Sequence, residues 1–174
     1  MYFKTSYLSP LGKIILLGCN DGLVGLWFEN QKYIEKLSSF QNVVETNHFD
    51  LLEQTKKWLD DYFLGLNPSP KVLKIKLVGT SFQQAVWNIL KEIPYGTVIT
   101  YKEVATKLAQ MRQTSKKAYQ AVGSAIGHNP ISIIIPCHRV VGSNGSLTGY
   151  AGGIDRKQKL LELEKVDIIN LKNE

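Results

Sequence analysis

The chain has 174 residues, of which 44% are hydrophobic, and it carries a formal net charge of +6 at pH 7. These values indicate a globular protein with one domain or two small ones. No stretch approaches the roughly 18 consecutive apolar residues of a membrane span. The first residues also lack the basic start and apolar run of a secretion signal, so we expect a soluble, cytoplasmic protein.

Three short apolar runs separated by turn residues open the chain. The two turns between them are short enough to join neighbouring antiparallel strands. We therefore predict a small antiparallel sheet, followed by a helix whose apolar residues recur at helical spacing. The predicted strands are 2–8, 13–17 and 23–28, and the predicted helix is 50–63.

A proline-rich segment, Asn67-Pro68-Ser69-Pro70, follows this helix and separates it from the next element, because proline cannot continue a helix. Residues 72–78 then form a last strand or an extended lead-in. We place a domain boundary near Gly79, which divides the chain into an N-terminal domain, 1–79, and a C-terminal domain, 80–174.

The C-terminal domain begins with two helical signals. Ser81 is a plausible N-cap of a helix that ends before Pro94, and its apolar residues fall on one helical face. Thr100 and Glu103 have the spacing of a capping box, which predicts a second helix that ends near Ala109.

A third helix is predicted from Ser115, a plausible cap, to about Gly127. The second and third helices, joined by a polar turn, form a helix-turn-helix arrangement. Most residues of the third helix are small, so it can approach another backbone closely, although close packing against a neighbouring helix remains an alternative. Long side chains that could read bases are scarce, so we expect nucleic-acid binding with little sequence preference.

Positive charge is concentrated in the second domain. Residues 1–79 hold nine Lys/Arg against eight Asp/Glu, whereas residues 80–174 hold twelve against seven. No acidic residue lies between Glu103 and Asp155. Because carboxylates would repel a phosphate backbone, this stretch indicates binding to a polyanion rather than a merely solvated basic face. Its basic residues are Lys107, Arg112, Lys116, Lys117 and Arg139.

An apolar run, 131–135, precedes Pro136 and Cys137. Its β-branched isoleucines predict a buried strand that ends at the proline, which would place the thiol at the mouth of a pocket. A cysteine after an apolar run is most often a small core residue. His138 and Arg139 favour a reactive role instead, because a nearby cationic group lowers the pKa of a thiol from about 8.5.

The sequence gives little reason to expect bound metal or cofactor. Its other cysteine is Cys19, and we expect no disulfide between Cys19 and Cys137 in a reducing compartment. With no CxxC pair and only three histidines, a zinc site is not expected. No dinucleotide fingerprint follows a predicted strand, so no cofactor is expected.

Short motifs of the second domain occur in the order found in one protein family. Pro136-Cys137-His138-Arg139-Val140 resembles the active-site signature of the DNA repair alkyltransferases that remove alkyl groups from the sixth-position oxygen of guanine. The other matching segments are 93–96, 100–105, 121–123, 129–130, 149–153 and 160–164. The resemblance, together with the predicted elements, implies an α+β fold with a small sheet and helix first and a mostly helical, winged-helix-like DNA-binding domain second.

The resemblance also implies roles for residues. Cys137 would accept the alkyl group, His138 would remove the thiol proton through a water molecule, and Glu164 would orient and charge His138. Tyr101 would crowd the target phosphate and help to protonate the leaving base. Asn129 would tie the turn after the third helix to the active-site strand.

On the DNA side, the family inserts the third helix into the minor groove and rotates the damaged nucleotide into a pocket. Backbone groups of Val140 and Ala151 would then contact the base, and Tyr150 would line the pocket. Gln120 stands where relatives usually place an arginine that fills the gap left by the extruded base. The residues expected to face DNA are Gln120, Ala121, Gly123, Arg139, Lys116 and Lys117.

A thioether is not hydrolysed under mild conditions, so each molecule is expected to act once. We also expect a monomer without an obligate protein partner. The alkyl group would come from guanine, with alkylated thymine as a further candidate substrate. One alternative is a non-enzymatic protein that binds alkylated lesions, although such relatives typically lack the cysteine. Another is a thiol hydrolase built on Cys137, His138 and Glu164, which would leave the helix-turn-helix unexplained.

Overall fold

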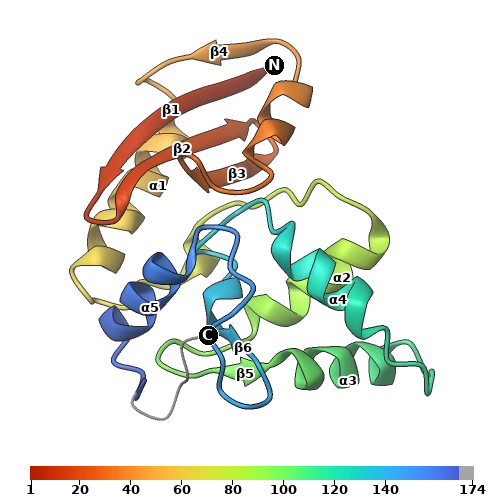
Figure 1. The fold of residues 1–174 in the computed structure, drawn as a ribbon. Helices are drawn as coiled ribbons and strands as arrows, with labels where there is room; N and C mark the ends of the chain where they lie inside the picture. The colour runs from red at the N-terminus through yellow and green to blue at the C-terminus, as the bar shows by residue number, and fades with distance from the viewer. Residues whose placement is uncertain (169–174) are drawn as a thin grey trace. The chain divides into compact units, whose positions relative to one another are not determined.

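The computed structural model of the chain describes residues 1–168, except the side chains at 35 and 36. It divides into two compact units (Figure 1). The first contains Met1–Val78 together with Pro130–Ser132, and the second contains the remaining described residues. Within residues 1–168, no helix is long and apolar enough to cross a membrane.

The first unit is built on a four-stranded sheet. Its first three strands form an antiparallel meander at the predicted positions. A fourth strand then pairs with β1 in the parallel direction, so the order is β3-β2-β1-β4 and the sheet is mixed rather than purely antiparallel as predicted. The strands are β1 (Tyr2–Ser9), β2 (Gly12–Cys19), β3 (Gly22–Phe28) and β4 (Val43–Glu45).

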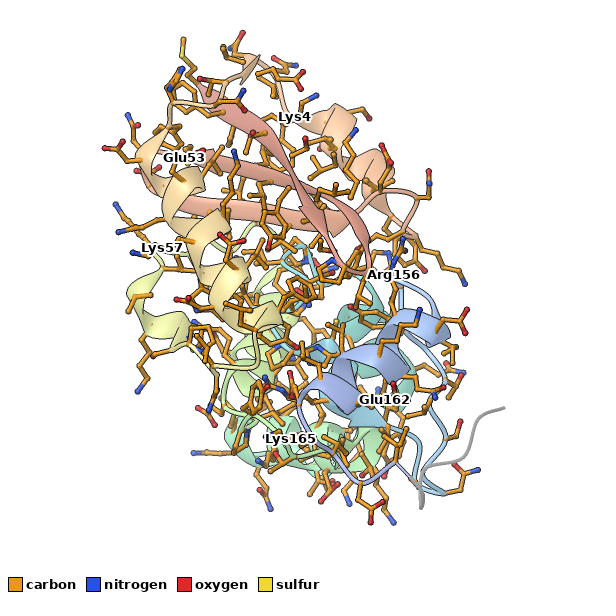
Figure 2. All side chains as sticks on the ribbon, turned by 90° about the vertical axis from the view of Figure 1, so that its left-hand side faces the viewer. Lys4, Glu53, Lys57, Arg156, Glu162 and Lys165 are labelled. Carbon is orange, nitrogen blue, oxygen red and sulfur yellow. The ribbon has the colours of Figure 1, made fainter. Side chains whose placement is uncertain are left out.

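Helix α1 (Asp50–Phe63) has the predicted bounds and packs against the sheet. Its buried face consists of residues at helical spacing, whereas Glu53 and Lys57 project outward (Figure 2). A 3-10 helix, η1 (Ile34–Ser39), precedes β4. The buried residues of α1 are Leu52, Thr55, Trp58, Leu59 and Tyr62.

The segment predicted as a strand or a lead-in, 72–78, is a lead-in. A 3-10 helix, η2 (Pro70–Val72), begins it, and it then meets β3 at a single bridge between Leu23 and Ile75. The Leu23 N–H donates to the carbonyl of Lys74 at 2.8 Å, and no further ladder follows in the described residues.

The second unit contains four α-helices, and each of the first two begins with a capping box. The α2 cap is Thr80, paired with Gln83, rather than Ser81 as predicted. The predicted box of Thr100 and Glu103 is confirmed by reciprocal hydrogen bonds. The helices are α2 (Ser81–Lys91), α3 (Tyr101–Met111), α4 (Tyr119–Gly127) and α5 (Ile154–Leu163).

Helices α3 and α4 pack against each other and against α2, which confirms the helix-turn-helix. Helix α4 begins later than predicted, because Ser115 does not cap it. Its N-cap is Ala118, which offers no side-chain acceptor to the first backbone N–H groups. Lys116 and Lys117 therefore lie in the turn before the helix, where both are exposed.

The buried run 131–135 is not a strand. Only Ile131 makes a bridge, with Leu26, and the chain then turns at Ile133, whose φ of 68° is unfavourable for a β-branched residue. The run ends in a 3-10 helix and a two-residue strand that pairs in parallel with β5. These elements are η3 (Cys137–Arg139), β6 (Val140–Val141) and β5 (Ile99–Thr100).

Candidate active site

Cys137 is buried at the start of η3, and its sulfur is held by the residue that follows α4. The Asn129 side-chain amide donates to Cys137 Sγ at 3.1 Å and to the carbonyl oxygen of Ile135 at 2.7 Å. Asn129 is itself 3% exposed. The end of the helix-turn-helix is thus fixed directly to the thiol and to the turn that precedes it.

The thiol is neutral in the resting protein. Burial raises the pKa of Cys137, although the hydrogen bond from Asn129 and the charge of Lys157 oppose that rise. The prediction that neighbouring cations would lower this pKa is therefore wrong, because burial outweighs them. The thiol must lose its proton during a reaction, and a base must be present to receive it.

His138, the next residue in the chain, is the candidate for that base. Its ring is completely buried, and Nε2 lies 2.7 Å from Oε1 of Glu164. A carboxylate can only accept, so Nε2 carries the proton and Nδ1 carries a lone pair. That Nδ1 atom is buried and has no hydrogen-bond partner in the protein. Burial lowers the pKa of His138 despite the opposing effect of Glu164, so the imidazole is neutral at pH 7.

Glu164, at the end of α5, is ionised and heavily hydrogen-bonded. Arg139 donates to it twice, from Nε at 2.8 Å and Nη2 at 2.9 Å, and the N–H of Gly96 donates at 3.2 Å. Burial alone would raise the pKa of this carboxyl, but His138 and Arg139 hold it well below its usual range. The fixed negative charge orients His138 and would stabilise an imidazolium.

The burial of Arg139 conflicts with its predicted role in DNA binding. Its side chain is largely buried, its charge is balanced by Glu164, and Nη1 donates to the carbonyl of Ile93 at 2.7 Å. Arg139 lies in the stretch without acidic residues, which ends at Asp155. Its partner Glu164 lies beyond that stretch, so the order of residues did not indicate that Arg139 is neutralised.

Tyr101, the first residue of α3, lies against the loop that precedes α5. Its hydroxyl donates to the carbonyl of Thr148 at 3.2 Å. A Cβ atom added to Gly149 would come within 2.4 Å of the same hydroxyl, so the close approach requires glycine. Burial raises the pKa of Tyr101 to about 12, which keeps the phenol protonated and able to donate.

Lys157 is a functional candidate that sequence reasoning missed. It lies on the buried face of α5, and its Nζ donates to the carbonyls of Val140 at 2.6 Å and Thr148 at 2.9 Å. Burial lowers the pKa of Lys157 to about 8. Its spacing in the sequence could have predicted this burial, because Lys157 is three residues after Ile154 and three before Leu160, on the apolar side of the helix. Glu162 and Lys165, by contrast, project outward (Figure 2).

We expect Lys157→Met to destabilise the protein by about 1 to 3 kcal/mol at pH 7, because two buried carbonyls lose their donor. The folded-state pKa of about 8 lies below that of an unfolded lysine, so the unfolded state binds more protons above pH 8. The difference in the free energy of unfolding between the wild type and Lys157→Met should therefore grow as the pH rises from 8 towards 10. Urea unfolding across this range measures it, and a difference that stays constant with pH would contradict the assignment.

The other predicted site residues fall into two groups. Gln120 and Ala121 are exposed on α4, and a Cβ added to Gly123 would meet nothing within 4 Å. Val140 and Tyr150, in contrast, are buried beside η3 and the following loop. Ala151 is half-buried in the turn before α5.

The backbone groups of Val140 already make hydrogen bonds within the protein, which limits those available to a ligand. Its N–H donates to the carbonyl of Cys137, and its carbonyl accepts from Lys157. Only the second lone pair of that carbonyl is left for another donor. Among residues 1–168, no group of three or more His, Cys, Asp or Glu side chains could hold a metal ion.

A helix-turn-helix fixed to a buried cysteine, with histidine and ionised glutamate behind it, defines a class of proteins that combine a nucleic-acid-binding motif with thiol chemistry. Residues 81–166 match the family described as "6-O-methylguanine DNA methyltransferase, DNA binding domain". Residues 2–77 match "6-O-methylguanine DNA methyltransferase, ribonuclease-like domain". The chain belongs to the 6-O-methylguanine DNA methyltransferase family.

Relatives cover almost the whole chain. A protein of Methanosarcina acetivorans named "Methylated-DNA--protein-cysteine methyltransferase" is 45% identical over 165 residues, which is 94% of this chain and 98% of that protein. A Haemophilus influenzae protein of the same name is 36% identical and covers 97% of this chain and 89% of its own. The crystal structure of Mycobacterium tuberculosis OGT in complex with DNA is 39% identical, with a TM-score of 0.77 over 94% of this chain and 92% of that one.

Proposed function

We propose that this protein repairs DNA by moving the alkyl group of 6-O-alkylguanine to the sulfur of Cys137, once per molecule. One observation carries the proposal. The buried thiol is held by Asn129, and the next residue is a neutral His138, whose Nδ1 has no hydrogen-bond partner and whose Nε2 is fixed by ionised Glu164. The family membership and the names of the relatives agree with this chemistry.

In the proposed reaction, Cys137 Sγ attacks the alkyl carbon as the bond from that carbon to the guanine oxygen breaks. The thiol proton passes through a water molecule to Nδ1 of His138, and Glu164 stabilises the resulting imidazolium. Tyr101 donates a proton to the departing purine, and the His138 imidazolium returns a proton to the phenolate, so that the thiol proton is balanced by the one the purine gains. The product is a thioether, which no residue of the site can hydrolyse.

The target oxygen is inaccessible within a duplex, so the nucleotide must rotate out of the helix at a cost of a few kcal/mol. We propose that α4 enters the minor groove, where its small residues Ala121 and Gly123 allow close approach, while Lys116 and Lys117 contact phosphates. The extruded base would be bounded by Tyr150 and Ala151 and would meet the carbonyl of Val140.

In this proposal, residues 80–174 carry both DNA binding and alkyl transfer, and residues 1–79 form a separate N-terminal domain. We also propose that the protein acts as a monomer. We propose the cytoplasm as its compartment, since the acceptor thiol must remain reduced. Alkylated thymine is a second proposed substrate.

Mass spectrometry tests the proposed function directly. The protein is mixed with duplex DNA that contains 6-O-methylguanine, digested, and the Cys137 peptide is weighed. One added methyl group per molecule, without further turnover, is the expected result. An unchanged mass despite DNA binding would instead support a protein that only recognises the lesion.

Gln120 offers a test of the extrusion step. A neutral amide can hydrogen-bond the unpaired partner base, so we expect Gln120→Ala to slow repair of duplex DNA by about three- to tenfold. Repair of the same oligonucleotide as a single strand should fall less, because no partner base is left behind. Gln110→Ala, an exposed glutamine at the end of α3, is the matched control. Equal losses on both substrates would argue against a role in filling the gap.

A further inference from the structure

Two large apolar side chains are exposed at the two ends of the helix-turn-helix turn. Met111, the last residue of α3, is 64% exposed, and Tyr119, the first residue of α4, is 49% exposed. In the described part of the second unit, no other large apolar side chain is so exposed. A tyrosine ring that is half exposed to water gains less free energy than a buried one, and exposed apolar groups of this kind often mark a binding surface.

The surroundings of Tyr119 are positively charged. Lys116 and Lys117 are exposed in the turn just before it. No acidic residue occurs in this part of the sequence. A nucleic acid suits this surface, because its phosphates complement the lysines and its stacked bases offer flat faces to the Tyr119 ring.

Tyr119 is larger than most other exposed residues of α4. Val122, Ala125 and Ile126 face the core, whereas the residues next to Tyr119 on the exposed side are small or polar. Gly123, one turn further along, has open space where a side chain would be. The first turn of α4 therefore exposes two large side chains, Tyr119 and Gln120, and the exposed residues that follow them are small.

We propose that Tyr119 stacks on the bases beside the lesion and, together with Gln120, fills the gap that the extruded nucleotide leaves. This inference rests on the proposed function. Proteins that enter the minor groove often insert an apolar wedge at an unstacked step. The Gln120 amide supplies hydrogen bonds but little stacking, and the neighbouring aromatic ring supplies what the amide lacks.

The test compares methyl transfer to Cys137 from duplex and single-stranded forms of one oligonucleotide. Tyr119→Ala should lower the duplex rate by about tenfold or more, with a much smaller change on the single strand. Tyr119→Phe should keep the duplex rate within about twofold, because stacking needs the ring and not the hydroxyl. Met111→Ala, at the other end of the turn, should leave the ratio of the two rates unchanged.

Equal losses of Tyr119→Ala on both substrates would overturn the proposal. So would a Tyr119→Phe variant as impaired as Tyr119→Ala, because the hydroxyl would then be the essential group. A 2-aminopurine base beside the lesion reports unstacking independently of transfer, and its fluorescence change should be reduced in Tyr119→Ala. If wild-type protein transfers no methyl group at all, the proposed function fails, while this fluorescence comparison still decides the role of Tyr119.

Discussion

Cys137→Ser is expected to abolish methyl transfer, with a loss on the order of a thousandfold or more, because a buried hydroxyl is a far weaker nucleophile than a thiolate. The substitution is nearly isosteric, and the Asn129 amide can still donate to a serine oxygen. Binding to duplex DNA should therefore be retained. Transfer is measured as methyl incorporation into the protein, and binding as fluorescence anisotropy of a labelled duplex.

Cys19→Ala is the control for this variant. Cys19 is also a free, buried thiol, but it packs in the first unit beside Leu17, Val24 and Trp27. Methyl incorporation should remain at one equivalent per molecule. Two results would refute the assignment: repair by the Cys137→Ser protein, or wild-type protein that consumes many equivalents of lesion without inactivating itself.

Glu164→Gln should lower the free energy of unfolding by about 3 to 5 kcal/mol at neutral pH, because it leaves the buried Arg139 guanidinium without a counter-charge. The carboxyl of Glu164 has a pKa held below that of an unfolded glutamate, about 4.3. Its stabilisation is therefore fully present above the unfolded pKa and is lost as the pH falls towards the folded one. The difference between wild type and variant should narrow below about pH 4.

Glu162→Gln is a matched control on the same helix, because Glu162 is exposed and its carboxylate accepts a surface hydrogen bond from Gln158. Its effect on stability should stay within about 0.5 kcal/mol. Chemical denaturation between pH 3 and 7 measures both variants. Equal stabilities of the Glu164→Gln and Glu162→Gln proteins would mean that the Arg139–Glu164 pair does not stabilise the fold.

Much of the fold could be predicted from local patterns. The bounds of α1 followed from apolar residues at helical spacing, and the start of α3 from the capping box of Thr100 and Glu103. The short parallel strand β4 could not be predicted, because three residues carry too little periodicity. The buried run 131–135 was mistaken for a strand, since an apolar composition indicates burial but does not determine backbone conformation.

The candidate site divides in the same way. Cys137, His138 and Glu164 were recognisable as motif residues, and the structure joins His138 to Glu164 by a hydrogen bond of 2.7 Å. Arg139 was expected at the DNA-facing surface, and Lys157 was not recognised as a site residue. In both cases the reason is that a charged side chain is ordinarily assigned to the surface. Their burial depends on acceptors that are distant in sequence, such as Ile93 for Arg139 and Thr148 for Lys157.

The three residues Pro130–Ser132 belong to the first unit, although the chain on either side of them belongs to the second. Leu26 holds them by two backbone hydrogen bonds of 2.9 Å, to the carbonyl of Pro130 and from the N–H of Ser132. Asn129, which fixes the acceptor sulfur, immediately precedes this stretch. A fragment that begins at residue 80 would lack Leu26 and therefore both of these hydrogen bonds, so the N–H of Ser132 and the carbonyl of Pro130 would have to find other partners.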